Sequence, residues 1–185
     1  MNRIALAGLA FFALLAGQAA RAADTRLAVP GQGWEVRFDA PAYEKKSEHD
    51  SPEQYRMAGN GGRFNLSFFV EAPTCAAGLG NEALVGCYKE ALARNPMVVP
   101  ATVRASALSK GVSVMYIIQG DWKGQKISLF NVNVLFAHRG KQGDLHVSIV
   151  EPQSADIEAL VKLAQSFDIV DTTPEPAAPG ASAAN

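Results

Sequence analysis

Two neighbouring segments carry polar side chains at alternating positions, which places those side chains on one face of an extended strand. In "ISLFNVNVLF" these are Asn131 and Asn133, and in "LHVSIV" they are His146 and Ser148. Only the short turn "RGKQG" precedes the second segment, so the two are expected to form neighbouring antiparallel strands. If the apolar faces of the two strands align, the four polar side chains share one face of the sheet.

Asn65 and Ser67 in "RFNLSFFVE" extend this polar pattern to a third strand. Amide, imidazole and hydroxyl groups so arranged could form the polar floor of a site for a small ligand or a partner. The same pattern also fits an ordinary sheet face that is solvated or covered by a helix. With both interpretations open, the candidate ligand-binding residues are Asn131, Asn133, His146, Ser148 and Asn65.

Serine hydrolysis is not favoured by this arrangement. Ser148 and His146 lie two residues apart on one strand face, a distance of about 7 Å, which is beyond hydrogen-bond reach for most rotamers. The sequence also contains no G-x-S-x-G motif, which would expose a serine at a sharp turn. The sequence therefore predicts a protein that is not an enzyme, with no catalytic residue and no cofactor.

Metal-ligating side chains occur in two places. Asp144 and His146 form D-x-H on one strand face with His138 across the predicted turn, and a second group lies in a predicted loop, at Glu48, His49 and Asp50. Carboxylates and imidazoles bind zinc or manganese, but neither group has diagnostic spacing. We assign no metal ligand and keep metal binding only within an alternative function.

The two cysteines of the chain, Cys75 and Cys87, lie in "PTCAAGLGNEALVGCYKE". They do not form C-x-x-C, which disfavours a redox pair, and two thiols without a nearby histidine make a poor zinc site. We predict a structural disulfide that joins a helix to the loop before it.

The first residues have the pattern of a secretory signal peptide, residues 1–22. Arg3 precedes an apolar run over residues 4–16, and Ala20-Arg21-Ala22 fits the cleavage site. The run is too short for a membrane span, which needs about 20 residues, and Gln18 stands where a lipoprotein would need its cysteine. We therefore expect a periplasmic or secreted protein with no stable membrane insertion after signal cleavage.

Charge and composition define the rest of the chain. Removal of Arg3 and Arg21 leaves 15 of the 17 basic residues against 18 acidic ones, which argues against a nucleic-acid partner. Residues 171–185, rich in Ala and Pro, are predicted to be a disordered tail. Residues 24–170 are of a common size for one domain.

Within this domain, alternation and turn residues predict strands separated by two amphipathic helices. The first helix follows Asn81 as its N-cap and ends at Asn95-Pro96, and the second covers residues 155–166 with Ser154 as its cap. The expected strands cover residues 33–41, 43–50, 53–60, 63–71, 101–109, 112–122, 125–138 and 144–152, with a further short strand at residues 168–170. This order predicts an α+β domain with a mostly antiparallel sheet.

Three segments, "WEVRFDAP", "FNLSFFVEAP" and "DLHVSIVEPQSADIEALVKLAQSFDIV", occur in an order that resembles the PsbP-like fold family. That family includes photosystem extrinsic subunits, Ran-binding nuclear import factors and DcrB-type bacterial envelope proteins. The resemblance implies an α/β/α sandwich, with a central, mostly antiparallel sheet and two main helices, and a role in binding or assembly.

Two functional hypotheses follow. The first is a non-enzymatic periplasmic accessory protein that acts through an envelope protein partner. The alternative is a carrier of a small molecule or metal ion that uses the polar face of the sheet.

Overall fold

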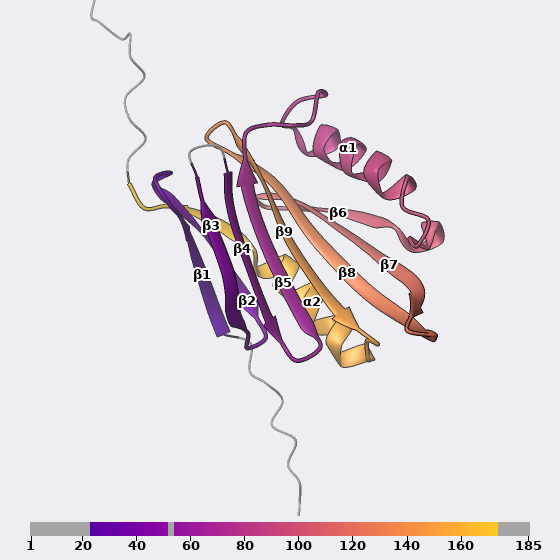
Figure 1. The fold of residues 1–185 in the computed structure, drawn as a ribbon. Coiled ribbons are helices and arrows are strands. Elements are labelled where there is room, and N and C mark those ends of the chain that lie inside the picture. Colours follow the sequence, from indigo (N-terminus) through magenta and orange to yellow (C-terminus); the bar gives the residue numbers. More distant parts are fainter. Residues whose placement is uncertain (1–22, 52–53, 174–185) are drawn as a thin grey trace, which may run out of the picture.

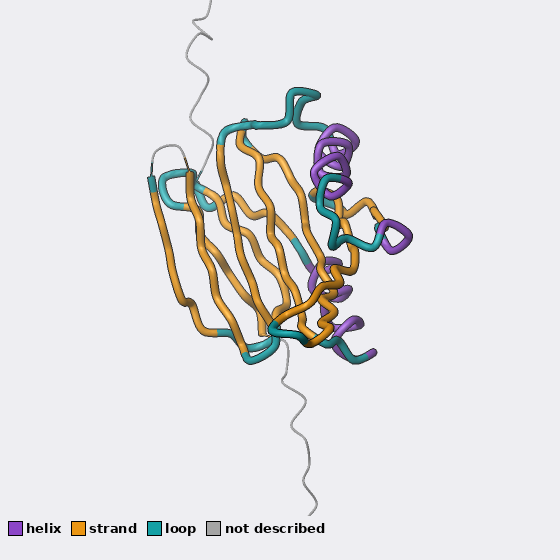
Figure 2. Tube along the Cα trace, turned by 45° about the vertical axis from the view of Figure 1, so that its right-hand side comes forward, coloured by secondary structure: helices purple, strands orange, loops and turns teal. Residues whose placement is uncertain are grey.

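The computed structural model describes residues 23–51 and 54–173, which form two antiparallel sheets and two α-helices (Figure 1, Figure 2). The predicted α+β class is confirmed. The expected signal peptide, residues 1–22, lies outside the described residues, as does the expected tail from residue 174 onward. No helix in the described ranges is long and apolar enough to cross a membrane.

The larger sheet has seven strands in the order β3-β4-β5-β9-β8-β7-β6, and every neighbouring pair is antiparallel. The strands are β3 (Glu44–Asp50), β4 (Gln54–Gly61), β5 (Phe64–Glu71), β6 (Arg104–Leu108), β7 (Gly111–Trp122), β8 (Gln125–His138) and β9 (Lys141–Val150). Alternation sends apolar side chains such as Leu66, Val132 and Leu145 to one face, where they are buried. Polar residues dominate the opposite face of β5 and β9.

A second sheet of three strands packs against the apolar face of the first. It consists of β1 (Ala23–Val29), β2 (Trp34–Ala40) and β10 (Asp168–Asp171), in the order β1-β2-β10. The expectation of one central sheet is therefore wrong in this respect, since β2 pairs with β1 and β10. Val36 and Phe38 of β2 are buried in the core between the two sheets, and this burial stabilises the two-sheet arrangement.

The helix α2 (Ser154–Ser166) lies behind the large sheet in the view of Figure 1, on the same face as the small sheet. The helix begins after Gln153, not after the predicted cap Ser154, because a capping box forms between Gln153 and Asp156. Leu160, Leu163 and Ala164 bury its apolar side. The C-terminal strand β10 follows directly, and the backbone N–H groups of Thr172 and Thr173 donate to the Gly33 carbonyl in the turn before β2. The ordered domain therefore continues beyond the predicted end at residue 170.

The helix α1 (Asn81–Ala93) crosses the opposite face of the large sheet, over β7 and β8 (Figure 1). Leu84 and Leu92 are buried there. The residue before the helix, Gly80, is its N-cap, and the predicted cap Asn81 donates its side-chain amide to the Gly111 carbonyl of β7 instead. A short 3₁₀ turn, η1 (Pro100–Thr102), leads from this helix to the edge strand β6.

The predicted disulfide between Cys75 and Cys87 is present, with an S–S distance of 2.08 Å and a Cα–Cα distance of 6.0 Å. Cys87 lies on α1, and Cys75 lies in the loop that leaves β5. The bond therefore joins the helix to the sheet strand before it. A structural disulfide of this kind indicates an oxidising, extracytoplasmic compartment.

Candidate functional site

The sheet register brings all five predicted ligand-binding residues together on the polar face. Asn65 of β5, Ser148 of β9 and Asn131 of β8 are aligned across three strands. His146 and Asn133 occupy the next row on this face. Asn131, Asn133 and Ser148 are buried, His146 is partly buried and Asn65 is exposed.

His146 is the centre of a hydrogen-bond network on this face. Its Nε2 lies 3.1 Å from Asn131 Oδ1, and its Nδ1 lies 3.4 Å from Ser67 Oγ. Because the Asn131 oxygen can only accept, the proton of a neutral ring is on Nε2, and Nδ1 accepts from the serine. Burial lowers the pKa of His146 to about 4, so the ring is neutral near pH 7.

The order Ser67–His146–Asn131 resembles a catalytic triad, with Ser67 in the place considered for Ser148. Two features argue against acyl transfer. An imidazole with so low a pKa is a weak general base. Ser67 also lies in the middle of β5, a strand paired on both sides, so the neighbouring backbone N–H groups are committed to the two ladders and form no oxyanion hole. The arrangement fits a structural network.

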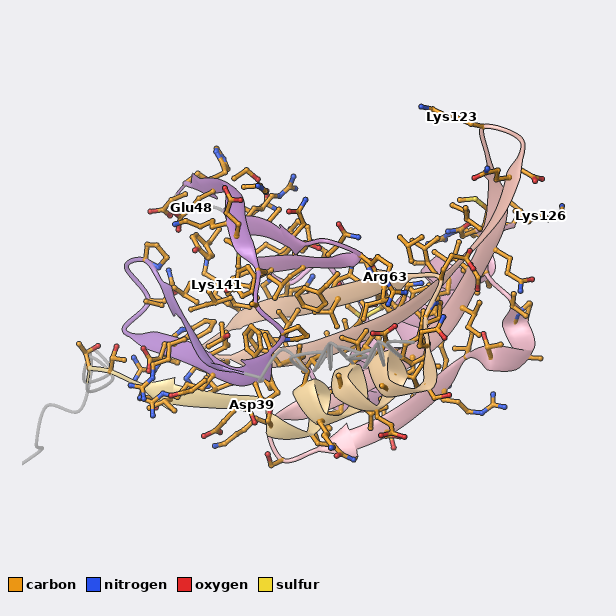
Figure 3. The ribbon with its side chains drawn as sticks, turned by 90° about the horizontal axis from the view of Figure 1, so that it is seen from below. Asp39, Glu48, Arg63, Lys123, Lys126 and Lys141 are labelled. Atoms are coloured by element: carbon orange, nitrogen blue, oxygen red, sulfur yellow. A yellow bond between two sulfur atoms is a disulfide. The ribbon has the colours of Figure 1, made fainter. Side chains whose placement is uncertain are left out.

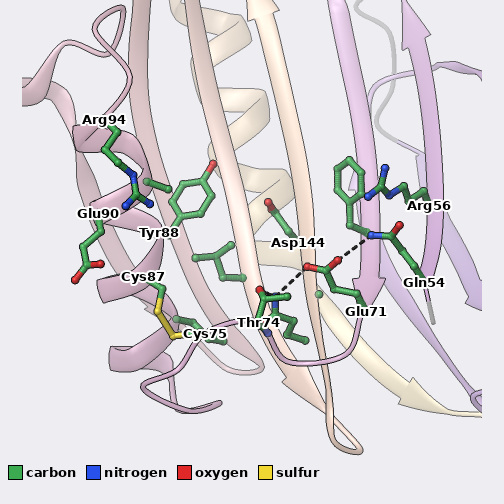
Figure 4. Close-up of a pocket in the computed structure, with 16 residues that line it drawn as sticks. Gln54, Arg56, Glu71, Thr74, Cys75, Cys87, Tyr88, Glu90, Arg94 and Asp144 are labelled. Atoms are coloured by element: carbon green, nitrogen blue, oxygen red, sulfur yellow. Dashed lines mark hydrogen bonds between the residues drawn. A yellow bond between two sulfur atoms is a disulfide. The ribbon is translucent and has the colours of Figure 1, made fainter.

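A groove lies beside this network, between α1 and the polar face of the sheet (Figure 4). Its volume is about 510 Å³. Arg56 of β4, Phe69 and Glu71 of β5 and Asp144 of β9 line the sheet side, and Tyr88 and Arg94 line the helix side. None of the five predicted ligand-binding residues lines the groove. Asn133 donates a hydrogen bond to Asp144, which does line it.

Asp144 is a partly buried carboxylate that lines the groove. Its two oxygens lie 2.8 and 2.9 Å from the Asn133 amide nitrogen, which donates to both. Burial raises the pKa of Asp144 to about 7, the Asn133 hydrogen bonds lower it, and the nearby charge of Glu71 raises it. No basic side chain in the described ranges forms an ion pair with Asp144.

The remaining polar groups of the groove are held in place. Glu71 accepts from Gln54 (2.8 Å) and from Gln142 (3.1 Å), and Gln142 also donates to Thr74 Oγ1. The dashed lines that meet at Glu71 in Figure 4 mark hydrogen bonds of this carboxylate. The Arg56 guanidinium lies over the Phe69 ring, 5.6 Å from its centroid.

On the helix side, the Tyr88 hydroxyl lies 3.1 Å from that of Tyr116 on β7. Burial raises the pKa of Tyr88, and the charge of Asp144 adds to this effect. The phenol is therefore neutral at ordinary pH. Tyr88 and Asp144 lie on facing sides of the groove (Figure 4).

The other metal-ligating residues considered from the sequence do not gather into a site. The expected loop at Glu48–Asp50 is part of strand β3, where alternation sends successive side chains to opposite faces. His138 instead lies 2.8 Å from Asp171 of β10. Among the described residues, no group of three or more His, Cys, Asp and Glu side chains is placed to hold a metal ion.

The sequence pattern places Asp144 in D-x-H and gives no signal for five other residues that line the groove, Arg56, Phe69, Glu71, Tyr88 and Arg94. The signal for Asp144 was its place two residues before His146, on the same strand face. The helix-side residues could not be found in this way, because their place depends on how α1 lies over the sheet.

Comparison with known proteins adds no identification. No protein-family model matches this chain, and no curated protein matches it.

Proposed function

We propose that this chain is a non-enzymatic extracytoplasmic binding protein that holds a small molecule in the groove between α1 and the sheet. The observation that carries this proposal is the groove itself, about 510 Å³ in volume, with the carboxylate of Asp144 partly buried in its wall. This volume lies within the range of small-molecule sites, roughly 300–1,000 Å³.

The composition of the groove supports the same function. Small-molecule sites combine apolar walls with a few polar groups that orient the ligand. Leu84, Leu135 and Phe69 supply apolar surface here, and Asp144 and Glu71 supply the polar groups. A carboxylate whose pKa is strongly shifted by burial in a cleft is a common mark of a functional site.

The compartment belongs to the proposal as well. The disulfide and the expected signal peptide both fit a periplasmic or secreted protein. Membership of the PsbP-like fold group is part of this proposal, and the helices on both faces of the large sheet support it.

The test uses two substitutions on α1. Ala91 lines the groove and Ala93 does not, although both are exposed on the same helix. A low-molecular-weight extract of the producing cells is titrated into ¹⁵N-labelled protein. We expect shifts of amides along α1, β5 and β9 in the wild type and in Ala93→Trp, and their loss in Ala91→Trp. If the extract shifts no groove amide, or if Ala91→Trp responds as the wild type does, the proposal is wrong.

A second candidate function is binding of an envelope protein partner, and the edge strand β6 favours it. Four of its five residues, Arg104 to Ala107, are exposed, and β6 pairs only with β7 among the described strands. The other edge, β3, is charged and has a register shift between Lys45 and Ser47, features that oppose further pairing. A partner strand could therefore add to β6.

This second candidate is tested with a photo-crosslinking residue at Ala105, in cells. The candidate predicts one discrete adduct that the same residue at Ala93 on α1 does not give. The absence of an adduct from Ala105, or identical adducts from both positions, would contradict it.

A further inference from the structure

The Asp144 side of the groove has more hydrogen-bond acceptors than donors. The Asp144 carboxylate can accept about four hydrogen bonds and receives two, both from one amide group. That amide belongs to Asn133, which is 1 % exposed, and its own oxygen Oδ1 is buried without a hydrogen-bond partner among the described residues. Asn133 does not line the groove, so the acceptor with unused capacity in the groove wall is the Asp144 carboxylate. Partly buried acceptors of this kind are normally satisfied.

The charges around the groove also leave Asp144 without compensation. The groups that face it are Arg56 from β4, Glu71 from β5, Tyr88, Glu90 and Arg94 from α1, Tyr116 from β7 and His146 from β9. Arg56 is stacked on Phe69, and neither Arg56 nor Arg94 forms an ion pair with Asp144. Glu71 adds a second negative charge, so the polar wall favours a cation.

The rest of the groove is shaped for an organic body. Leu84 and Ala91 of α1 and Leu135 of β8 line it with apolar surface, and the ring of Tyr88 lies across from Asp144. A ligand with a charged head and an apolar or aromatic body would bury both parts at once. A metal ion would use only the head group, and the described residues offer it fewer than three carboxylate, imidazole or thiolate ligands.

From these observations we propose that the groove binds a primary organic amine, with its ammonium group on Asp144 and its apolar body against Tyr88, Leu84 and Leu135. An ammonium group has three N–H donors and no acceptor, which matches the unused acceptor capacity of the Asp144 carboxylate. This inference rests on the proposed function, because it names the ligand class of the same groove.

The experiment compares three probes that share one aromatic body. They are 2-phenylethylamine, 2-phenylethanol and 3-phenylpropionate, which carry a positive, a neutral and a negative head group. Each is titrated into ¹⁵N-labelled wild type, Asp144→Asn and Asp39→Asn. Asp39 is an exposed carboxylate on β2 of the small sheet (Figure 3), and it controls for the loss of one negative charge.

We expect the amine to bind the wild type and Asp39→Asn about ten- to a hundredfold more tightly than the alcohol. The anion should bind least. Asp144→Asn should bind amine and alcohol about equally. Affinity for the amine should also fall below about pH 7, where Asp144 takes up a proton, while an alkylammonium keeps its charge.

The comparison of the three probes on the wild type decides the inference even if Asp144→Asn fails to fold. Equal or tighter binding of the alcohol or the anion in the groove would overturn the inference and leave the proposed function intact. The same holds if no probe shifts a groove amide while the cell extract does, or if calcium chloride shifts these amides and the amine does not. Failure of both the probes and the extract would overturn the inference and the proposed function together.

Discussion

At the scale of single residues, Asp144 and His146 lie on one strand face and show how the polar face affects stability. Both have lost much of their contact with water, and burial disfavours the charged form of each. For Asp144 this means a cost to the fold at neutral pH, which proteins accept most often at functional sites. For His146 it means a neutral ring that holds Asn131 and Ser67 in place.

The first prediction concerns Asp144→Asn. The Asp144 carboxyl group has a pKa of about 7 in the folded protein, against an ordinary value of 3.8. The folded state therefore holds this proton more tightly than the unfolded state does. The stability of the wild type therefore falls as pH rises from about 4 through 7, and asparagine has no such dependence. Denaturant unfolding at several pH values measures this. Between pH 4 and 7, the free energy of unfolding of Asp144→Asn should rise relative to that of the wild type by on the order of 2–4 kcal/mol. A constant difference between the two proteins at all pH values would contradict the assignment.

The second prediction concerns His146, whose pKa of about 4 lies below the ordinary 6.5. The unfolded state therefore binds the proton more readily than the folded state does. The stability that the buried neutral ring of His146 contributes is fully present above about pH 6.5 and is lost as the pH falls toward 4. The ring resonances, assigned by their absence in His146→Gln, should titrate near pH 4 in an NMR experiment. A midpoint near 6.5 would show that the ring is hydrated.

At the scale of elements, the position of α1 over β7 and β8 creates the groove, and the disulfide joins the middle of that helix to the loop after β5. Cys75 and Cys87 are 12 residues apart in sequence, so the bond closes a short loop. It restricts the unfolded chain and holds the β5–α1 loop against the groove.

The third prediction is that the double substitution Cys75→Ser, Cys87→Ser lowers the free energy of unfolding by about 3 kcal/mol. The measurement is urea unfolding of the variant and of the oxidised wild type. Loss of two hydrogens in the intact mass of the wild type confirms that the bond is present. Equal unfolding midpoints would show that the bond has no role in stability.

The fourth prediction compares two glycines. Gly143 of β9 is paired with Phe136 of β8, whose ring is fully buried. A Cβ on Gly143 would overlap Cζ of that ring. Gly143→Ala should therefore destabilise the fold by about 1–3 kcal/mol. Gly86 lies within α1, and a Cβ there would meet nothing within 4 Å, so Gly86→Ala should stabilise by about 0.5–1 kcal/mol. Thermal unfolding should show a lower unfolding temperature for Gly143→Ala and a higher one for Gly86→Ala than for the wild type. A lower unfolding temperature for both variants would contradict this explanation of the packing.

The sequence predicted the elements better than their arrangement. Alternation was clear in β2, β5, β8 and β9, because each sends a regular series of apolar side chains to the core. Strand β1, with "ADTRLAV", was not predicted because few of its residues are large and apolar. The division into two sheets was not predicted either, because alternation identifies a strand without identifying its partner.

The same limit applied to the site. The common face of Asn131, Asn133, His146 and Ser148 follows from a period of two residues and a short turn, and both are visible in the sequence. The groove depends on the crossing of α1 over the sheet, which brings Tyr88 to the side facing Asp144. No local pattern contains that information.

At the scale of the whole molecule, α2 and the small sheet cover one face of the seven-stranded sheet, while α1 covers only β7 and β8 on the other. The first arrangement gives a large core, and the second leaves a groove.

In Figure 3 the charged hairpin tip that carries Lys123 and Lys126 projects away from the rest of the molecule. The fold thus has one face of the large sheet covered by the main core and one face that carries a groove.

The most direct test of this account is native mass spectrometry of the protein isolated from the extracytoplasmic fraction of its own cells. The wild type and Ala93→Trp should each carry a small bound molecule, and a basic compound if the further inference holds. Ala91→Trp should be free of it. A wild type without any bound small molecule, or the same bound mass on Ala91→Trp, would contradict the claim that the groove is the binding site.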